Sequence, residues 1–194
     1  MAGWLNQVLA TPLHGQGVTP VRFALRDVDR HDTIRELSYT LAVDQMDLDQ
    51  LMRCVQDEFG PQAGIAASTW NGFLNGFIDL VVRVDGQYWM VDWKSNWLAP
   101  RAGDYTRTAM AEAMRDHAYY LQLSLYLLAL HRMLRLRLPD YDYDTHMGGA
   151  HYLFLRGMDG REGDTGVYSV CPPRQMIEQL DEIAGCPASN RLNA

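Results

Sequence analysis

Several features are missing from this sequence of 194 residues, and each absence excludes a class of protein. No run of about 18 apolar residues is present, which argues against a membrane-spanning helix. The N-terminal residues lack the basic and apolar regions of a secretory signal. The three cysteines, Cys54, Cys171 and Cys186, are scattered, which argues against a disulfide framework or a zinc site. We therefore expect a cytoplasmic protein without a membrane partner.

The sequence also has little positive charge and no nucleotide-binding loop. It holds 17 Lys and Arg against 24 Asp and Glu, for a net charge of −7. Because no Gly-x-x-x-x-Gly-Lys-Ser/Thr loop is present, we do not expect the chain to hydrolyse ATP. Basic residues gather only locally, in two groups: Arg101 and Arg107, and then His131, Arg132, Arg135 and Arg137. Such groups could help to bind the phosphates of a nucleic acid. The alternative for the second group is that its positive charges interact favourably with the C-terminal end of a helix.

The length and composition of the chain suit one globular domain with a hydrophobic core, because 47% of the residues are hydrophobic. We expect a single domain over 1–194, with a core at about 34–157 and a loose tail at about 186–194. Asp47 is placed to cap a helix that ends at Gly60-Pro61. The patterns predict helices over 4–10, 48–59, 104–136 and 174–184, and strands over 37–43, 73–84, 87–95 and 150–155. A flexible loop is expected over 157–166.

The dipeptide Asp85-Gly86 lies between two alternating apolar runs and is a strong hairpin signal, because a two-residue type I′ turn needs positive φ at both positions. Extending the register outward from that turn places Asp79 directly opposite Asp92. Lys94 follows two residues later and therefore shares a face with Asp92. Directly opposed like charges destabilise a sheet, so fold stability alone would not select this pair. A divalent cation between the carboxylates would remove the repulsion. The alternative is an Asp92–Lys94 ion pair with Asp79 as a polar strand residue.

This arrangement resembles the Asp-(Asp/Glu)-x-Lys nucleases of the restriction-endonuclease-like fold. Further motifs resemble the RecB nuclease family, the C-terminal domain of the β chain of the bacterial RecBCD helicase-nuclease (exonuclease V). They cover about residues 72–157 and are Gly76-Phe77-Ile78-Asp79, Asp92-Trp93-Lys94-Ser95-Asn96-Trp97, Gln122-x-x-x-Tyr126, Leu128-Ala129-Leu130-His131-Arg132, Asp140-Tyr141-Asp142-Tyr143, Gly148-Gly149 and Tyr152-Leu153-Phe154-Leu155-Arg156-Gly157. The resemblance implies an α/β (α+β) fold, with a mixed sheet and a central hairpin flanked by helices.

The resemblance also assigns a metal centre. It implies Mg²⁺, with Mn²⁺ as an alternative and Ca²⁺ as a non-productive mimic, held by Asp79, Asp92 and the backbone carbonyl of Trp93. Lys94 would complete the catalytic set by orienting the attacking water and stabilising charge on the phosphate. The alternative is that Lys94 is a surface lysine without a catalytic role.

Three further residues are accessory candidates. Gln122 and Tyr126 lie four apart and share a helix face, so both are candidates for contacts with the site or the DNA. Core packing is the alternative for Tyr126. Glu36 matches an acidic position of the family, and its alternative is a solvated strand residue.

The family has one more metal ligand, a histidine on a helix upstream of the first aspartate. His14 and His31 lack that helical context, so the role is transferred to neither. We expect an N-terminally shortened nuclease domain whose metal site is one ligand short.

The expected function is Mg²⁺-dependent hydrolysis of DNA phosphodiesters within a RecB-like complex for double-strand-break repair and recombination. The resemblance implies an exodeoxyribonuclease that leaves a 5′-phosphate and a 3′-hydroxyl. Because the chain is acidic, we expect it to receive linear single-stranded or unwound DNA from partner subunits of a RecBCD-like complex. The alternative is a catalytically weak docking module that binds partner subunits or a recombinase.

Overall fold

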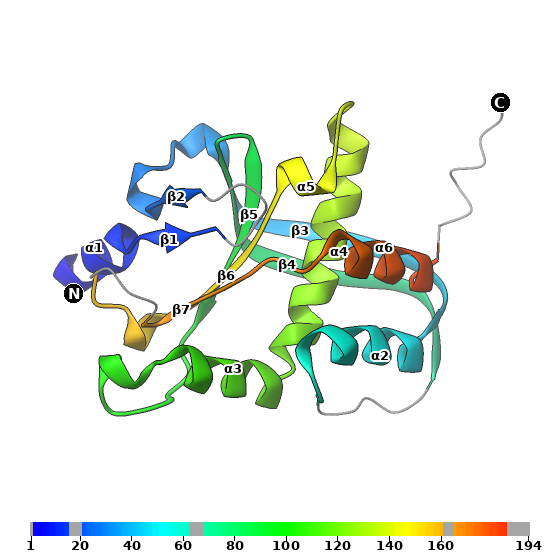
Figure 1. The fold of residues 1–194 in the computed structure, drawn as a ribbon. Helices are drawn as coiled ribbons and strands as arrows, with labels where there is room; N and C mark the ends of the chain where they lie inside the picture. Colours follow the sequence, from blue (N-terminus) through cyan, green and yellow to red (C-terminus); the bar gives the residue numbers. More distant parts are fainter. Residues whose placement is uncertain (1, 16–20, 63–67, 161–164, 186–194) are drawn as a thin grey trace.

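A five-stranded mixed sheet forms the centre of the protein, shown in Figure 1 as a computed structural model. The structure describes residues 2–15, 21–62, 68–160 and 165–185. In spatial order the strands are β3 (Thr33–Asp47), β4 (Thr69–Val84), β5 (Gln87–Lys94), β6 (Met147–Phe154) and β7 (Val167–Val170). Only β5 and β6 are parallel neighbours, and the other pairs are antiparallel. The predicted mixed sheet with a central hairpin is confirmed.

Helices cover the two faces of this sheet unequally (Figure 1). On one face, the main apolar cluster joins the sheet to α2 (Leu48–Phe59), α3 (Arg107–Asp116), α4 (Tyr119–Arg137) and α6 (Arg174–Ile183). Two smaller clusters lie on the other face, beneath α1 (Ala2–Ala10) and the short pair β1 (Leu13–His14) and β2 (Arg22–Phe23). The remaining elements are α5 (Tyr143–His146) and the 3-10 turns η1 (Leu25–Asp27), η2 (Arg30–Asp32), η3 (Ala102–Asp104) and η4 (Leu155–Gly157). Within the described residues, no helix has the length and apolar character needed to span a membrane.

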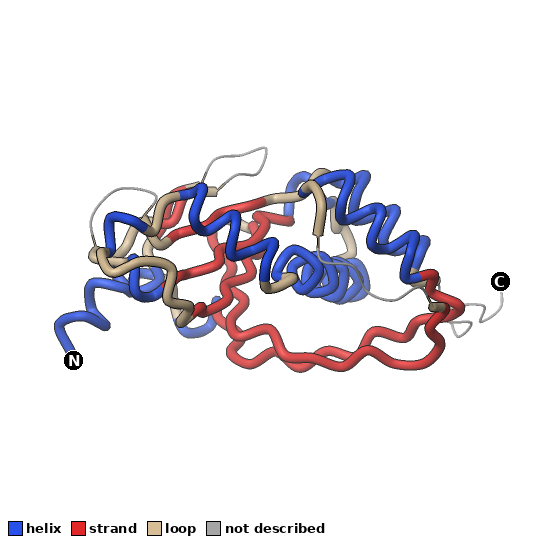
Figure 2. Tube along the Cα trace, turned by 90° about the horizontal axis from the view of Figure 1, so that it is seen from below, coloured by secondary structure: helices blue, strands red, loops and turns tan. Residues whose placement is uncertain are grey.

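The hairpin between β4 and β5 has the predicted turn and register. Asp85 has φ 50° and Gly86 has φ 80°, as a type I′ turn requires. Its pairs run from Val84–Gln87 to Leu80–Val91. Beyond that point β4 continues alone with β3, and Figure 2 shows the two strands extending as a long ribbon below the helices. The two strands of the hairpin therefore separate at the level of Asp79.

The direction of the side chains on β4 also changes at Asp79. Ile78 and Val81 both pack in the main cluster although they are three residues apart, whereas Leu80 packs in the small clusters on the other face. On β3, Glu36 interrupts the ladder between the Arg35–Leu80 and Leu37–Ile78 pairs, and it adopts a left-handed φ of 49°. A positive φ is uncommon outside glycine and re-aims a strand. Asp79 thus lies at a local twist in the ribbon.

The single long helix predicted over 104–136 is wrong, because the chain forms α3 and α4 with a break between them. Ala118 has a left-handed φ of 54° and directly precedes α4. The break rotates the buried face of α4 relative to that of α3, so the two helices do not share one continuous buried stripe. Met110, Met114 and Leu128 are buried, whereas Leu121 and Leu125 are half-buried and His117 is exposed.

The ends of α2 and α6 lie close to their predicted positions. Asp47 caps α2, where its carboxylate accepts hydrogen bonds from the backbone N–H groups of Asp49 and Gln50. Helix α6 ends one residue before the predicted limit. The predicted tail over 186–194 lies outside the described residues, as do residues 161–164 of the predicted loop.

Candidate functional site

Two aspartates meet where β4 and β5 separate. Asp79 follows the last recorded pair of the hairpin, and its Oδ2 accepts a hydrogen bond of 3.0 Å from the backbone N–H of Trp93. Asp92, the residue before Trp93, is 3% exposed and is influenced electrostatically by Asp79. The register predicted from the turn therefore holds to the Leu80–Val91 pair, and beyond it the Asp79 carboxylate reaches the backbone of Trp93.

Lys94 lies beside Asp92 and is buried rather than surface-reaching. The Lys94 Nζ is 2.6 Å from the Asp92 Oδ2, and the two side chains are 9% and 4% exposed. The alternative of a surface lysine is therefore wrong. The reason is the position of β5 in the middle of the sheet, where β6 and α4 cover the Lys94 side chain.

A network of polar side chains from α4 and β6 holds the Lys94 ammonium. The Gln122 Oε1 accepts hydrogen bonds from Lys94 Nζ at 3.0 Å and from the Tyr152 hydroxyl at 3.3 Å. The Gln122 Nε2 donates to the Tyr126 hydroxyl at 3.0 Å. The predicted pair on one face of the helix is thus brought to the site, Gln122 by direct contact with Lys94 and Tyr126 through Gln122.

Two aromatic rings also contact the ammonium, and sequence reasoning missed both roles. The Lys94 Nζ lies 3.9 Å from the ring centroid of Tyr119 and 5.0 Å from that of Tyr152. Such contacts stabilise a desolvated cation. Tyr152 pairs with Asp92 across the parallel β5–β6 ladder. A parallel pairing between distant segments leaves no local signal, so only the three-dimensional register could have identified Tyr152.

Burial controls the ionisation of this site. It raises the pKa of Asp92 above its ordinary value; the neighbouring Lys94 opposes this shift and Asp79 adds to it. Burial likewise raises the pKa of Tyr126, where the Gln122 hydrogen bond acts in the opposite direction, and it raises the pKa of Tyr152 far more. The two phenols therefore stay protonated at neutral pH and keep their hydroxyl protons for hydrogen bonding.

The oxygen atoms of this site suit a hard divalent cation. Asp92 Oδ2 is buried, and its ion pair with Lys94 Nζ at 2.6 Å is its one polar contact among the described residues. A cation would neutralise this oxygen together with Asp79. In the described part of the chain, no group of three or more His, Cys, Asp or Glu side chains is arranged to hold a metal. Two carboxylates are nevertheless enough for Mg²⁺, which retains waters and binds substrate phosphates.

A cavity of about 520 Å³ opens from Asp79 and Trp93 toward the N-terminal segments. It is also lined by Glu36, the third accessory candidate, which is exposed and does not contact Lys94 or Gln122. Arg30 and Arg35 line the same cavity, are exposed and take part in no ion pair with another described residue. They supply positive charge next to Asp79, and the sequence analysis did not single them out.

Three of the five arginines that the sequence singled out have structural contacts. Arg132 and Arg135 on α4 both pair with Asp181 on α6, and Arg132 also donates hydrogen bonds to the backbone carbonyls of Ala42 and Gly185. Arg107 lies over the ring of Tyr168 at 4.7 Å. Arg107, Arg132 and Arg135 are therefore engaged in contacts within the fold, whereas Arg101 and Arg137 are exposed.

Comparison with known proteins gives a consistent result. The profile of the PD-(D/E)XK nuclease superfamily matches residues 16–187. The chain is 42% identical over 185 residues to the RecBCD enzyme subunit RecB of Escherichia coli, covering 93% of this chain and 15% of that protein. It is 35% identical over 185 residues to the RecB subunit of Haemophilus influenzae, covering 94% of this chain and 15% of that protein. The chain thus spans about 15% of the length of these curated relatives.

The profile covers most of the chain, and the matched range includes the Asp79, Asp92 and Lys94 arrangement at the opening of the hairpin. The chain therefore belongs to the PD-(D/E)XK nuclease superfamily and resembles the nuclease domain of RecB.

Proposed function

We propose that this domain hydrolyses DNA phosphodiester bonds with Mg²⁺ as its cofactor. The observation that carries the proposal is the meeting of Asp79, Asp92 and Lys94 at the opening of the hairpin, with Gln122 bonded to the Lys94 ammonium. Two carboxylates beside a buried cation form a site for phosphoryl chemistry that a purely structural sheet would not select.

Each residue has a distinct part in the proposed reaction. Asp79, Asp92 and the carbonyl of Trp93 would hold the cation, and Mn²⁺ would replace Mg²⁺ whereas Ca²⁺ would bind without turnover. A bound divalent cation supplies a Lewis acid for the phosphate oxygens and lowers the pKa of water. Lys94 would place its fixed charge next to the oxygens that become more negative in the transition state. Gln122 fixes the position of that ammonium through its 3.0 Å hydrogen bond.

The cavity beside Asp79 gives the DNA strand a path to the site. Arg30 and Arg35 line it together with Glu36, so the strand would pass two guanidinium groups on its way to Asp79. The chain as a whole carries a net charge of −7. We therefore propose that linear single-stranded or unwound DNA is delivered to this site by other subunits, as the name of the RecBCD relatives suggests. Double-strand-break repair and recombination is the proposed setting.

A docking module is the second candidate, and one observation favours it. Phe73 and Phe77 on β4 are 68% and 63% exposed and lie four residues apart on the free side of the β3–β4 ribbon. Exposed apolar residues on a strand pair are typical of a surface that another protein covers. In that case the domain would bind partner subunits or a recombinase, and its metal site would be inactive.

Degradation of linear single-stranded DNA by the purified chain separates these functions. We expect degradation with Mg²⁺, none with Ca²⁺ or a chelator, and none for Asp79→Asn or Asp92→Asn. Asp57→Asn is the matched control, because Asp57 is an exposed residue of α2 remote from the opening. If the unsubstituted chain were as inactive as Asp79→Asn at low salt and high enzyme concentration, the nuclease proposal would be wrong.

Divalent cations should also stabilise the fold, since they would bind the native Asp79–Asp92 pair but not the unfolded chain. At a concentration tenfold above the dissociation constant, the gain is about 1.4 kcal/mol, or roughly 3–6 °C in melting temperature. Thermal melts with and without Mg²⁺ or Ca²⁺ measure it. Asp79→Ala should abolish the shift and Asp57→Asn should keep it. An unchanged melting temperature at millimolar Mg²⁺ would argue that the site is too weak to matter.

The two arginines of the cavity should set the salt dependence of DNA binding. For single strands the logarithm of affinity falls with the logarithm of salt concentration by about 0.7 per phosphate contact. Arg30→Gln and Arg35→Gln should each reduce this slope by about 0.7, measured with oligo(dT) in Ca²⁺. Arg137→Gln is the control, because Arg137 is exposed at the end of α4 and does not line this cavity. An equal loss of slope in all three variants would contradict the proposed path.

A further inference from the structure

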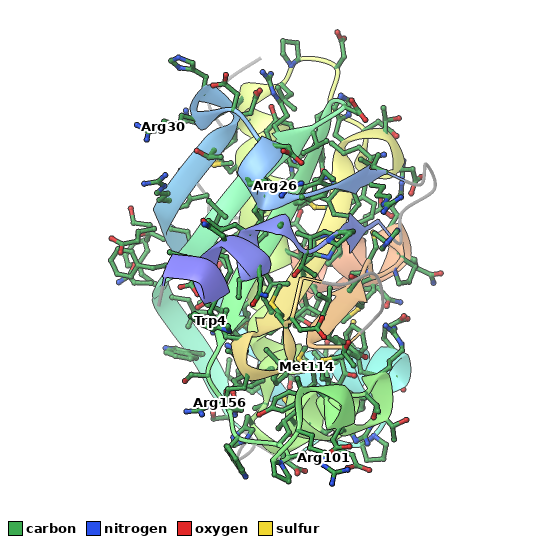
Figure 3. All side chains as sticks on the ribbon, turned by 90° about the vertical axis from the view of Figure 1, so that its left-hand side faces the viewer. Trp4, Arg26, Arg30, Arg101, Met114 and Arg156 are labelled. Carbon is green, nitrogen blue, oxygen red and sulfur yellow. The ribbon has the colours of Figure 1, made fainter. Side chains whose placement is uncertain are left out.

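A second cavity, of about 500 Å³, lies where the chain leaves the catalytic strand. Its walls include Trp97 from the segment after β5, Trp4 from α1 and Arg156 from η4. In Figure 3, Trp4 and Arg156 lie along the same side of the molecule. Trp97 is 66% exposed and Trp4 is 44% exposed. Two exposed indole rings around one hollow differ from scattered surface residues, which need no explanation.

The segment that carries Trp97 is held firmly on both sides of the ring. The Tyr105 hydroxyl donates a hydrogen bond to the Asn96 carbonyl and accepts one from the Leu98 N–H, both at 3.2 Å. The Asn96 side chain in turn accepts a hydrogen bond of 3.1 Å from the Tyr119 hydroxyl. Trp97 is therefore presented to solvent by a fixed backbone, and binding through it would cost little ordering entropy.

Arg156 adds a cation to this aromatic wall. Its guanidinium carbon lies 5.6 Å from the ring centroid of Trp97, and its Nε donates a hydrogen bond of 3.0 Å to the Ser95 carbonyl. An aromatic face next to a guanidinium is the combination that single-strand-binding proteins use, with the ring stacking on a base and the cation near the backbone. The large exposed fraction of Trp97 leaves much of the indole available to a ligand.

The cavity is linked to the catalytic residues through a short path. Trp97 is the third residue after Lys94, a separation of about 10 Å for an extended chain. Tyr119, which anchors Asn96, also contacts the Lys94 ammonium at 3.9 Å from its ring centroid. A base held against Trp97 would therefore belong to a nucleotide close to the phosphate at the catalytic site.

We propose that Trp97, with Trp4 and Arg156, forms a stacking subsite for a base of single-stranded DNA that flanks the cleaved phosphodiester. The inference rests on the proposed nuclease function and deepens it. Stacking tolerates any base sequence, as a nuclease that degrades unwound DNA requires. It also supplies affinity that does not depend on positive charge, which this acidic chain lacks.

Binding of oligo(dT) in Ca²⁺, measured by fluorescence anisotropy, tests the proposal without any need for hydrolysis. Trp97→Ala should weaken binding about tenfold, and Trp97→Tyr should retain most of the affinity because it keeps an aromatic face. Trp70→Ala is the matched control. Trp70 is an exposed tryptophan, at 44%, but it lies near the start of β4, far along the ribbon from Asp79. Melting temperatures should be similar in all four proteins, since both replaced residues are exposed.

An abasic oligonucleotide, which keeps the phosphates but lacks bases, identifies the interaction as stacking. The unsubstituted chain should bind it about tenfold more weakly than oligo(dT), and Trp97→Ala should show little further loss. Equal affinity of Trp97→Ala and the unsubstituted chain for oligo(dT) would overturn the proposal, as would a loss that is just as large on the abasic strand. Failure of the unsubstituted chain to bind oligo(dT), or a Trp97→Ala defect confined to binding a protein subunit, would do the same.

These outcomes are separable from those of the nuclease proposal. A chain that degrades DNA with Mg²⁺ but binds it without Trp97 would refute only the stacking subsite. A chain that binds oligo(dT) through Trp97 but never degrades it would refute the nuclease function and the placement of the subsite beside a cleaved bond, but not the stacking on Trp97.

Discussion

Replacement of Lys94 by methionine should lower the rate of DNA hydrolysis by about a hundredfold, the effect of losing roughly 3 kcal/mol of transition-state stabilisation. Methionine fills a similar volume but carries no charge. The Gln122 and Tyr152 side chains would keep their own 3.3 Å contact, so the shape of the site should persist. The measurement is the initial rate with linear single-stranded DNA and Mg²⁺ at low salt.

The same substitution should also destabilise the metal-free protein, because Lys94 is buried and paired with the buried Asp92. Removal of one partner of such a pair typically costs about 3–5 kcal/mol, since the remaining charge has no compensation. Mg²⁺ or Ca²⁺ should recover part of this loss by neutralising the carboxylate. The rate comparison must therefore be made below the melting temperature of the variant in the presence of the metal.

Two further variants distinguish catalysis from folding. Lys94→Met combined with Asp92→Asn removes both charges, so it should recover stability but remain inactive. Lys94→Arg keeps the charge but replaces the ammonium, which contacts the Tyr119 and Tyr152 rings, with a larger planar group, so its activity should also fall. Lys94 is the single lysine of the chain, which also has sixteen arginines. Full activity of Lys94→Met would contradict the proposed role.

The hairpin at the site could be predicted from the sequence because its determinants are local. Asp85-Gly86 defines the turn, and the two-residue period of the strands then fixes which residues oppose each other as far as Leu80 and Val91. This register predicts that Asp79 lies near the Asp92 segment, but it does not predict that the pairing ends at Leu80 or that the Asp79 carboxylate accepts a hydrogen bond from the Trp93 N–H.

The features that were missed depend on contacts between distant segments. The burial of Lys94 requires β6 to pair with β5 in parallel and to bring Tyr152 next to Asp92. The break between α3 and α4 occurs at Ala118, where no glycine or proline marks it. The roles of Arg132 and Arg135 were misread because their partner, Asp181, lies on the last helix.

Acid should destabilise this protein well above the pH at which carboxylates titrate, because of one buried histidine. His151 on β6 is fully buried, and its Nε2 has no hydrogen-bond partner among the described residues. Burial, with a smaller contribution from His14, lowers the pKa of His151 to about 3. Its Nδ1 lies 2.8 Å from the Ser169 hydroxyl, and its ring stacks on Trp89.

The sign of the effect follows from proton binding in the two states. The unfolded chain takes up a proton on this histidine near pH 6.5, whereas the folded protein does not until about pH 3. The stability contributed by neutral His151 is therefore complete above about pH 6.5 and is lost at about 1.4 kcal/mol per pH unit below it. Between pH 7 and pH 5 the free energy of unfolding should fall by about 2 kcal/mol from this residue. His131, whose pKa is also lowered by burial, adds in the same direction.

Urea denaturation at several pH values measures this slope, and a paired substitution isolates its source. His151→Phe with Ser169→Ala replaces both partners of the buried hydrogen bond by apolar groups, which avoids leaving one unsatisfied. Its stability at pH 7 can differ from that of the unsubstituted chain, but the loss between pH 7 and pH 5 should shrink by about 2 kcal/mol. His117→Gln is the control, because His117 is exposed in the folded protein and its replacement should leave the slope unchanged. If the double variant kept the full pH dependence, the acid sensitivity would have to come from groups other than His151.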